Sequence, residues 1–318
     1  MFVLNFVLQT AHEEVVQILE NIPEITWKAK FYDLINNRTH LNSIYKTKST
    51  INDVINLKKE FLKYIPINSK KAPDYWDWIA MNPQCSDYVP DLGQCQYGDA
   101  QVSVMNTFSD FRCFQGKDPN RVEYSPQYML NCYQNEQDCC QTGGFGDTLK
   151  TKASSCISYQ SGLTGKSGKC SVTCDDGSPL PELVQTEELI DICTPSDGDD
   201  EEAIKEALIN GPISTTIWVY EDLQYYESGV YQHVYGKDIG YSACEIVGYG
   251  EENRVKFWKV KNIWGRQWGE NGYFKILRGS SQYGGECEIE MFCCQAVISQ
   301  QFLTQEIARV LQSNLCLY

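Results

Sequence analysis

Thiol-dependent acyl transfer is the chemistry suggested by the most informative residues of this 318-residue chain. It needs a cysteine at a helix N-terminus, where the dipole and a protonated histidine lower the thiol pKa, and a histidine that shuttles the proton. It also needs a residue that orients the imidazole and hydrogen-bond donors for the oxyanion. Cys95 precedes a predicted helix and Asn262 begins the motif Asn-Ile-Trp-Gly, but the chain has only three histidines, His12, His40 and His233. The set of residues for this chemistry is therefore incomplete.

The elements that must position these residues follow from the spacing of apolar side chains. This spacing predicts helices over residues 12–19, 51–64, 99–111, 196–210 and 300–315. β-branched and aromatic enrichment between turn residues predicts strands over residues 213–220, 244–249, 257–261 and 272–277. Residues 132–174 are rich in Gly, Ser and Cys, which predicts loops held by disulfides. Helices followed by strands indicate an α+β protein with two lobes.

Charge and composition exclude several classes of partner. The net charge of -15 disfavours nucleic acid and anionic membrane surfaces. No run approaches the roughly 20 apolar residues that a membrane helix needs. Fifteen cysteines indicate an oxidising compartment, so we expect the secretory pathway, outside the cell or in a lysosome-like organelle. No cysteine pair has C-x2-C spacing, so we expect no metal, and no cofactor motif is evident.

The first seventy-odd residues differ in composition from the rest of the chain. Residues 2–11 form a short apolar run, which is either the core of a secretory signal or the first helix of an N-terminal segment. Residues 65–73 form a linker rich in Pro, Lys and Ser. Cysteines begin only at Cys85. A domain boundary is therefore predicted near residue 72.

Several motifs resemble those of the papain-like (C1) cysteine peptidases, most closely the cathepsin B branch. They are Asn82-Pro83-Gln84-Cys85, Asn210-Gly211-Pro212, Ser228-Gly229-Val230-Tyr231-Gln232-His233, Asn262-Ile263-Trp264-Gly265 and Gly272-Tyr273-Phe274-Lys275-Ile276-Leu277-Arg278-Gly279. Thr26-Trp27-Lys28-Ala29 resembles the short propeptide of that branch. The resemblance implies a helical left lobe, a β-barrel right lobe and a substrate cleft between them. We therefore expect a propeptide-like segment over residues 1–71, a papain-like domain over 72–298 and a helical tail over 299–318.

The resemblance places the nucleophile and the oxyanion donor at residues that cannot act in these roles. Leu92 stands where the family has the oxyanion glutamine. Counting forward from Cys95 puts the nucleophile at Gly98, whereas counting back from Cys113 puts it at Asp99. Neither residue is a thiol, and the role that the family gives Cys95 is structural.

The base is replaced as well, while the orienting residue is kept. Ser242 holds the position of the catalytic histidine, and His233 belongs to a turn. Asn262, which orients the imidazole in the family, and Trp264, which shields it, are both retained. Loss of the nucleophile or the base alone costs about 10^6 in rate in a triad enzyme. Three of the four catalytic positions are thus replaced.

The cysteine framework is better preserved. The resemblance implies the pairs Cys85–Cys113, Cys95–Cys140, Cys132–Cys170 and Cys156–Cys174, and leaves open the state of Cys139, Cys193, Cys244, Cys287, Cys293, Cys294 and Cys316. Between Cys156 and Cys174 the chain is short and has no histidine pair, so the resemblance implies a truncated occluding loop. Gly143 and Gly144 correspond to the cleft backbone that pairs with an extended peptide.

Three functional hypotheses follow. The first is an inactive homologue whose cleft binds an extended peptide, a protein partner or its own N-terminal segment. The second is an active cysteine endopeptidase with an unconventional site, which requires Cys95 or Cys139 to be free. The third is a structural secreted or surface component in which Cys316 or another unpaired cysteine bonds to a second chain.

Overall fold

The computed structural model describes most of the domain and part of the N-terminal segment. The described residues are 12–32, 72–85, 88–132, 138, 140, 152–181, 184–185, 188–191, 201–280, 284–291 and 293–297. The predicted helices over 51–64 and 300–315, the apolar run over 2–11, the tail over 299–318 and the pair Gly143 and Gly144 lie outside them. Within the described residues, no helix is long and apolar enough to cross a membrane.

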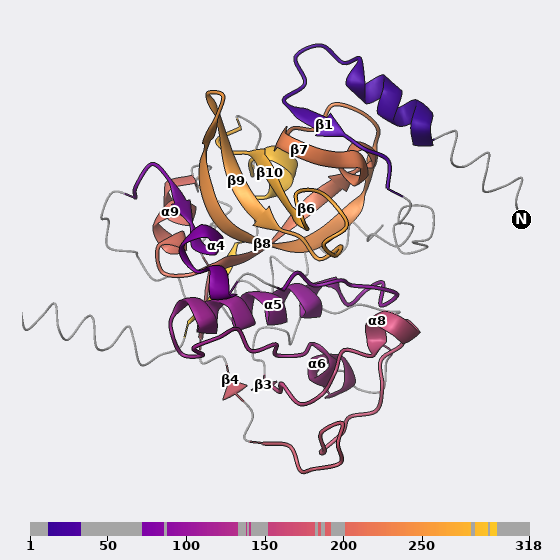
Figure 1. Ribbon diagram of the computed structural model, residues 1–318, viewed down its shortest axis with the longest axis vertical. Helices are drawn as coiled ribbons and strands as arrows, with labels where there is room; N and C mark the ends of the chain where they lie inside the picture. Colours follow the sequence, from indigo (N-terminus) through magenta and orange to yellow (C-terminus); the bar gives the residue numbers. More distant parts are fainter. Residues whose placement is uncertain are drawn as a thin grey trace, which may run out of the picture.

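The lower lobe in Figure 1 is built around one long helix. This helix is α5 (Asp99–Phe114), and nearly all of its side chains are buried, including small polar ones. Shorter elements surround it: α4 (Trp78–Met81), η2 (Pro83–Cys85), α6 (Gln127–Cys132), α8 (Ser161–Thr164) and the pair β3 (Lys152–Ala153) and β4 (Val184–Gln185). Most of the described chain between residues 152 and 181 lacks regular structure, in line with the predicted disulfide-held loops.

The other lobe is a strongly curved, mostly antiparallel sheet (Figure 1). Its strands follow the order β1-β7-β10-β9-β8-β6-β11-β5, and β2 also pairs with β8. Their bounds are β1 (Trp27–Ala29), β2 (Trp76–Asp77), β5 (Glu188–Asp191), β6 (Ile213–Tyr220), β7 (Tyr226–Tyr231), β8 (Asp238–Glu252), β9 (Val255–Lys261), β10 (Tyr273–Leu277) and β11 (Cys294–Val297). Helix α9 (Glu201–Leu208) and the short turns η3 (Glu221–Tyr225) and η4 (Glu286–Glu288) accompany the sheet. The largest apolar core lies within this lobe.

The two-lobed α+β architecture is confirmed, with differences at element ends. Helix α5 continues to Phe114 because its last turn packs its apolar residues into the core. Strand β8 is far longer than the predicted 244–249, since its polar first half pairs with β6. The described part of the helix predicted over 196–210 is α9, which ends at Leu208. Strand β7 was not predicted because its tyrosines and glycine gave no regular alternation.

A buried cluster of charges joins the helical lobe to the sheet. On α5, Asp110 accepts hydrogen bonds from Lys261 Nζ of β9 and from Arg121 Nε, each at 2.5 Å, and both Asp110 and Lys261 are fully buried. Arg121 also donates to the Asn106 side-chain oxygen, and the Asn106 amide donates to Glu245 of β8. Burial raises the pKa of Glu245 well above its usual range, and the nearby Asp110 charge adds to this effect. Such pairs are costly to break because an unpaired charge stays buried.

The described part of the N-terminal segment docks on the edge of the sheet. Residues 12–20 are helical, and β1 pairs antiparallel with β7, with Trp27 opposite Gly229 (Figure 1). Trp27 is 4% exposed, and its indole nitrogen donates to the Gln232 carbonyl at 2.9 Å. Tyr32 donates to the Tyr226 carbonyl at 2.9 Å. These residues lie against the sheet lobe. The resemblance implies that the segment also runs through the cleft, but the residues that would do so lie outside the described part.

We expect the substitution Trp27→Ala to loosen this docking by about 3–5 kcal/mol, because a fully packed tryptophan leaves a large cavity and an unpaired Gln232 carbonyl. Limited proteolysis within residues 65–73 should then be faster than in the wild type. The exposed neighbour Lys28 provides the matched control, and Lys28→Ala should be cut at the wild-type rate. Equal cutting of all three proteins would contradict a role for Trp27 as the anchor.

Candidate functional site

The first residue of α5 faces the sheet lobe. Asp99 is 5% exposed, and its Oδ2 accepts a hydrogen bond from the Ala243 backbone N–H of β8 at 3.2 Å. Its other oxygen, Oδ1, is buried without a hydrogen-bond partner. The Asp99 carboxylate thus joins the helix N-terminus to β8. One of the two sequence counts places the nucleophile at this residue.

Gly98, the residue that the other count selects, is the N-cap of α5. A Cβ added there would lie 2.6 Å from the Cys95 sulfur, which is a severe overlap. A side chain at residue 98 therefore collides with the Cys95 side chain, whereas the side chain of Asp99 reaches β8. The geometry favours Asp99 over Gly98 as the residue that faces the Ser242 region.

Burial sets the protonation of Asp99. It raises the pKa of this carboxyl from 3.8 to about 6, and hydrogen bonds from the Ala243 amide and the amides of the helix start lower it by less. No basic side chain contributes to this balance. The nucleophile of a thiol peptidase is stabilised as an anion, but this site stabilises the neutral form of its acid.

Ser242 and its neighbours on β8 offer no base. Ser242 is 4% exposed and lies opposite Ile217 of β6. The next residue, Ala243, binds Asp99 through its amide, and Cys244 is a fully buried free thiol. Burial raises the pKa of the Cys244 thiol, so it stays protonated and unreactive near neutral pH. A serine hydroxyl has no pKa near neutrality with which to accept a proton.

Asn262, to which the resemblance assigns the orientation of an imidazole, is buried. Its Oδ1 accepts from the Ile263 backbone N–H at 2.8 Å, and its Nδ2 is buried without a hydrogen-bond partner. Trp264 is 5% exposed and packs edge-on against Trp268, with ring centroids 4.9 Å apart. The aromatic residues that the resemblance assigns to shielding are therefore present, while the Asn262 side-chain oxygen accepts a hydrogen bond from the backbone.

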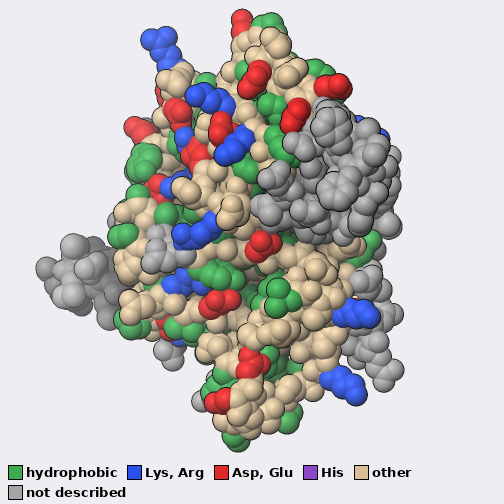
Figure 2. Space-filling model, turned by 45° about the vertical axis from the view of Figure 1, so that its right-hand side comes forward, with side chains coloured by type: hydrophobic (Ala, Val, Ile, Leu, Met, Phe, Trp, Pro, Cys, Tyr) green, Lys and Arg blue, Asp and Glu red, His purple; other side chains and the backbone are tan. Residues whose placement is uncertain are grey.

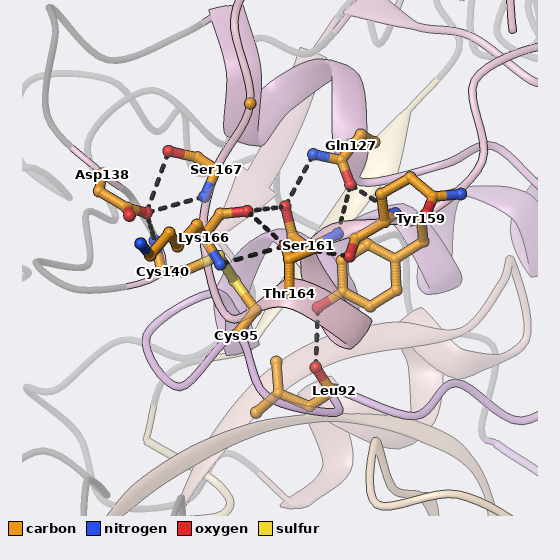
Figure 3. The surroundings of a disulfide bond; sticks show 12 residues. Leu92, Cys95, Gln127, Asp138, Cys140, Tyr159, Ser161, Thr164, Lys166 and Ser167 are labelled. Carbon is orange, nitrogen blue, oxygen red and sulfur yellow. Dashed lines mark hydrogen bonds between the residues drawn. A yellow bond between two sulfur atoms is a disulfide. The ribbon is translucent and has the colours of Figure 1, made fainter.

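Leu92 is held beside this region by its backbone. Its N–H donates to the Ile263 carbonyl at 2.8 Å, and its own carbonyl accepts from the Tyr159 hydroxyl at 2.8 Å (Figure 3). The Leu92 side chain is 6% exposed and joins the large apolar core. An alkyl side chain has no N–H with which to stabilise an oxyanion. Tyr159 was not singled out from the sequence, because a tyrosine among loops carries no distinguishing spacing.

Cys95 is not a free thiol. It forms a disulfide with Cys140, packed against Tyr159 and a network of polar loop residues (Figure 3). Three further pairs, Cys85–Cys113, Cys132–Cys170 and Cys156–Cys174, complete the set that the family resemblance implies. Cys244 and Cys287 are free and buried. Among the described cysteines, none is therefore both free and exposed, and Cys139 lies outside them.

The described residues offer no metal centre. Nowhere in this part of the chain do three His, Cys, Asp or Glu side chains converge in a set that suits a metal ion. On the face shown in Figure 2, acidic and basic side chains are interspersed, so this face presents no basic stripe of the kind that binds nucleic acid. Asp99, Ser242 and Asn262, at the positions that the resemblance assigns to catalysis, are all buried.

Fold and site together define a two-lobed protein of the thiol-peptidase type. The model of the papain family of cysteine proteases matches residues 72–297. The chain therefore belongs to the papain family of cysteine proteases.

Its relatives are cathepsin B-like. The Giardia intestinalis protein Cathepsin B-like CP3 is 40% identical over 232 residues, which cover 70% of this chain and 75% of the relative. Cathepsin B-like CP2 of the same organism is 38% identical over 228 residues, covering 69% of this chain and 72% of the relative. The curated relatives thus support the cathepsin B branch.

Solved proforms share the fold. Procathepsin B S9 from Trypanosoma congolense has a TM-score of 0.69 and 25% identity, covering 91% of this chain and 97% of that one. The proform of the ragweed pollen allergen Amb a 11, a cysteine protease, has a TM-score of 0.71 at 22% identity, covering 93% and 89%. The match to proforms agrees with an N-terminal segment that packs on the domain.

Asp99 should make stability depend on pH. Because its pKa is raised in the folded protein, its contribution is fully present below the unfolded value of about 3.9 and is lost as the pH rises through about 6. We expect wild type to lose about 3 kcal/mol of unfolding free energy between about pH 4 and pH 7 relative to Asp99→Asn, which keeps an acceptor for the Ala243 amide.

Denaturant unfolding at several pH values measures this difference. The control Asp74→Asn changes an exposed aspartate and should follow the wild-type curve. If the wild type and Asp99→Asn showed parallel curves over this range, the buried, neutral-favouring environment of Asp99 would be wrong.

Proposed function

We propose that this cathepsin B-like protein is not a peptidase and that it binds extended peptides in the cleft between its lobes. One observation carries the loss of activity: the α5 residue that reaches β8 is Asp99, a carboxyl bound to the Ala243 amide. By resemblance, this is where a thiolate would face an imidazole. A buried carboxyl is a weak nucleophile, and the neighbouring Ser242 supplies no base.

The retained parts support binding. Asn262, Trp264 and Trp268 keep the architecture around the site, and the disulfides keep the loops of the helical lobe in place. In this family, an extended peptide pairs with cleft backbone, as the resemblance implies for Gly143 and Gly144. Strand addition of this kind needs no thiol. The disulfides among the described residues also fit a secretory or lysosome-like location.

The N-terminal segment is the first candidate occupant. Its β1 strand and the Trp27 side chain already pair with β7. Without a nucleophile and base, the protein does not cleave itself, so residues 1–71 stay attached unless another peptidase removes them. In the resting form, the segment therefore competes with other peptides for the domain.

The alternative, an active endopeptidase with an unconventional site, requires Cys95 or Cys139 to be a free thiol, and Cys95 is not free. Cys95 is bonded to Cys140, and the pKa values of Cys244 and Cys287 are raised by burial. That alternative now depends on Cys139 alone, with a base from elsewhere.

Labelling with an epoxide probe for active-site thiols tests the proposal. We expect no labelling of the wild-type chain at about pH 5 or pH 7, with an active cathepsin B as the positive control. The double variant Asp99→Cys/Ser242→His should gain slow labelling, because it restores a thiol and an imidazole at the positions that the resemblance assigns to them.

A second double variant tests the assignment of the nucleophile position. Gly98→Cys/Ser242→His should stay unlabelled, because a Cβ at residue 98 overlaps the Cys95 sulfur. Stoichiometric labelling of the wild type that a peptide competes away would overturn the inactive assignment. Labelling of the residue 98 variant but not the residue 99 variant would move the nucleophile position to Gly98.

A further inference from the structure

One face of α5 is polar and contributes to the contact between the lobes. Polar residues spaced three or four positions apart share this face of the helix. They are Asp99, Ser103, Asn106 and Asp110. All of these side chains are buried, and each forms a hydrogen bond with the sheet lobe, which lies above the helix in Figure 1. On this face, polar groups therefore hold the helix to the sheet.

A row of polar side chains on the sheet lies against the second half of this face. Glu245 of β8 is opposite Lys261 of β9, and Lys261 is opposite Tyr273 of β10. Directly opposed residues place their side chains next to each other on one face of a sheet. Glu245 accepts a hydrogen bond from the Asn106 amide, and Lys261 donates to Asp110. A carboxyl, an amine and a phenol are thus buried side by side.

Both cations of this cluster bind one carboxylate and leave the other without an ion pair. Lys261 Nζ and Arg121 Nε each lie 2.5 Å from an Asp110 oxygen. In the part of the chain that the structure describes, no lysine or arginine lies within ion-pair distance of Glu245. Its Oε2 accepts from the neutral Asn106 amide, and its Oε1 is buried without a hydrogen-bond partner. A charged carboxylate in these surroundings is costly, whereas the neutral acid is not.

The groups that face Glu245 act on its charge in opposite directions. Asp110 of α5 repels a negative charge there, whereas Lys261 of β9 and Arg121 attract it. Tyr273 of β10 stays a neutral phenol, because burial raises its pKa. Burial of Glu245 outweighs the two cations and raises its pKa well above the usual range. The Glu245 side chain therefore favours its protonated form in the folded protein.

We propose that Glu245 is a proton-dependent latch between the lobes, closed in its neutral form and open in its charged form. The neutral acid fits the dry contact, because Asn106 binds one oxygen and the acid O–H has the Asp110 carboxylate as a nearby acceptor. The charged form places a second buried anion beside Asp110 and competes with it for Lys261 and Arg121. The second half of α5 then loosens from β8.

The latch is closed at acidic pH. Because the pKa of Glu245 is raised in the folded protein, its contribution to stability is fully present below the unfolded value of about 4.3. This contribution is lost as the pH rises through the folded value, so the lobes loosen toward neutral and alkaline pH. Neither a catalytic thiol nor a bound peptide takes part, so the latch is independent of the proposed function.

Hydrogen–deuterium exchange of the full-length protein at about pH 5 and about pH 8 tests the latch. The parent protein carries Asp99→Asn, so that the titration of Asp99 does not contribute. After correction for the intrinsic effect of pH on amide exchange, we expect the amides of α5 and β8 to exchange about tenfold faster at the higher pH. A single titrating group changes an opening equilibrium by up to about tenfold per pH unit.

The variant Glu245→Gln in the same parent locates the effect, because glutamine copies the shape and the neutral state of the protonated acid. It should keep slow exchange at both pH values. The control Glu251→Gln changes an exposed acid of β8 and should exchange as the parent does. Equal pH dependence in Glu245→Gln and the parent overturns the latch, as does a parent whose exchange does not quicken with pH. Fast exchange of Glu245→Gln at both pH values also overturns it, because the carboxylate would then be the form that holds the lobes.

Discussion

The contact between Asp110 of α5 and Lys261 of β9 is the constraint on which the site depends. Both groups are fully buried, and Arg121 completes the charge balance on the second Asp110 oxygen. Pairing offsets the cost of burying the two charges. It also fixes the position of α5 along the sheet. Asp99 begins the same helix about three turns earlier, and Asn262 directly follows Lys261. This one ion pair thus sets the position of the α5 N-terminus relative to β8. It also sets the position of Asn262 relative to α5 and β8.

Our proposal is that the junction between the lobes keeps its place while its chemistry differs from that of an active relative. By resemblance, an active relative joins the lobes here with a thiolate and an imidazolium. This chain joins them with a hydrogen bond from the Ala243 amide to the Asp99 carboxyl. Buried atoms without partners remain at Asp99 and Asn262. Unsatisfied polar groups of this kind are uncommon in folded proteins, and they also occur elsewhere in the described residues, for example at Trp76 and Tyr273.

Much of the fold was predictable because local patterns and the motifs agree. Strand β6 has the predicted bounds, since its alternating burial matches its alternating side chains. Helix α5 was placed at its correct first residue, Asp99. Strand β7 was missed, because its pairing with β1 depends on Trp27, a residue about 200 positions away. The edge strand β5 and its neighbour β11 are also products of long-range pairing.

The site was harder to derive from sequence than the fold. Motif spacing led to Ser242 and Asn262, but left Gly98 and Asp99 as alternatives, because an extra residue separates the two anchors. The overlap of a Gly98 Cβ with the Cys95 sulfur and the hydrogen bond between Asp99 and the Ala243 amide favour Asp99. The hydrogen bond from the Tyr159 hydroxyl to the Leu92 carbonyl was not found, since the two residues belong to separate segments of the chain. Spacing within one segment does not encode such contacts.

The central claim is that a buried, neutral-favouring carboxyl occupies the position of the nucleophile. Its most direct test is a carbon-13 NMR titration of aspartate carboxyl groups in the full-length protein, with the Asp99 signal assigned by its absence in Asp99→Asn. Our account predicts a midpoint of about 6 for Asp99, because burial raises its pKa. A midpoint near the ordinary value of about 3.9 would show a solvated or ion-paired Asp99, and would contradict the buried junction described here.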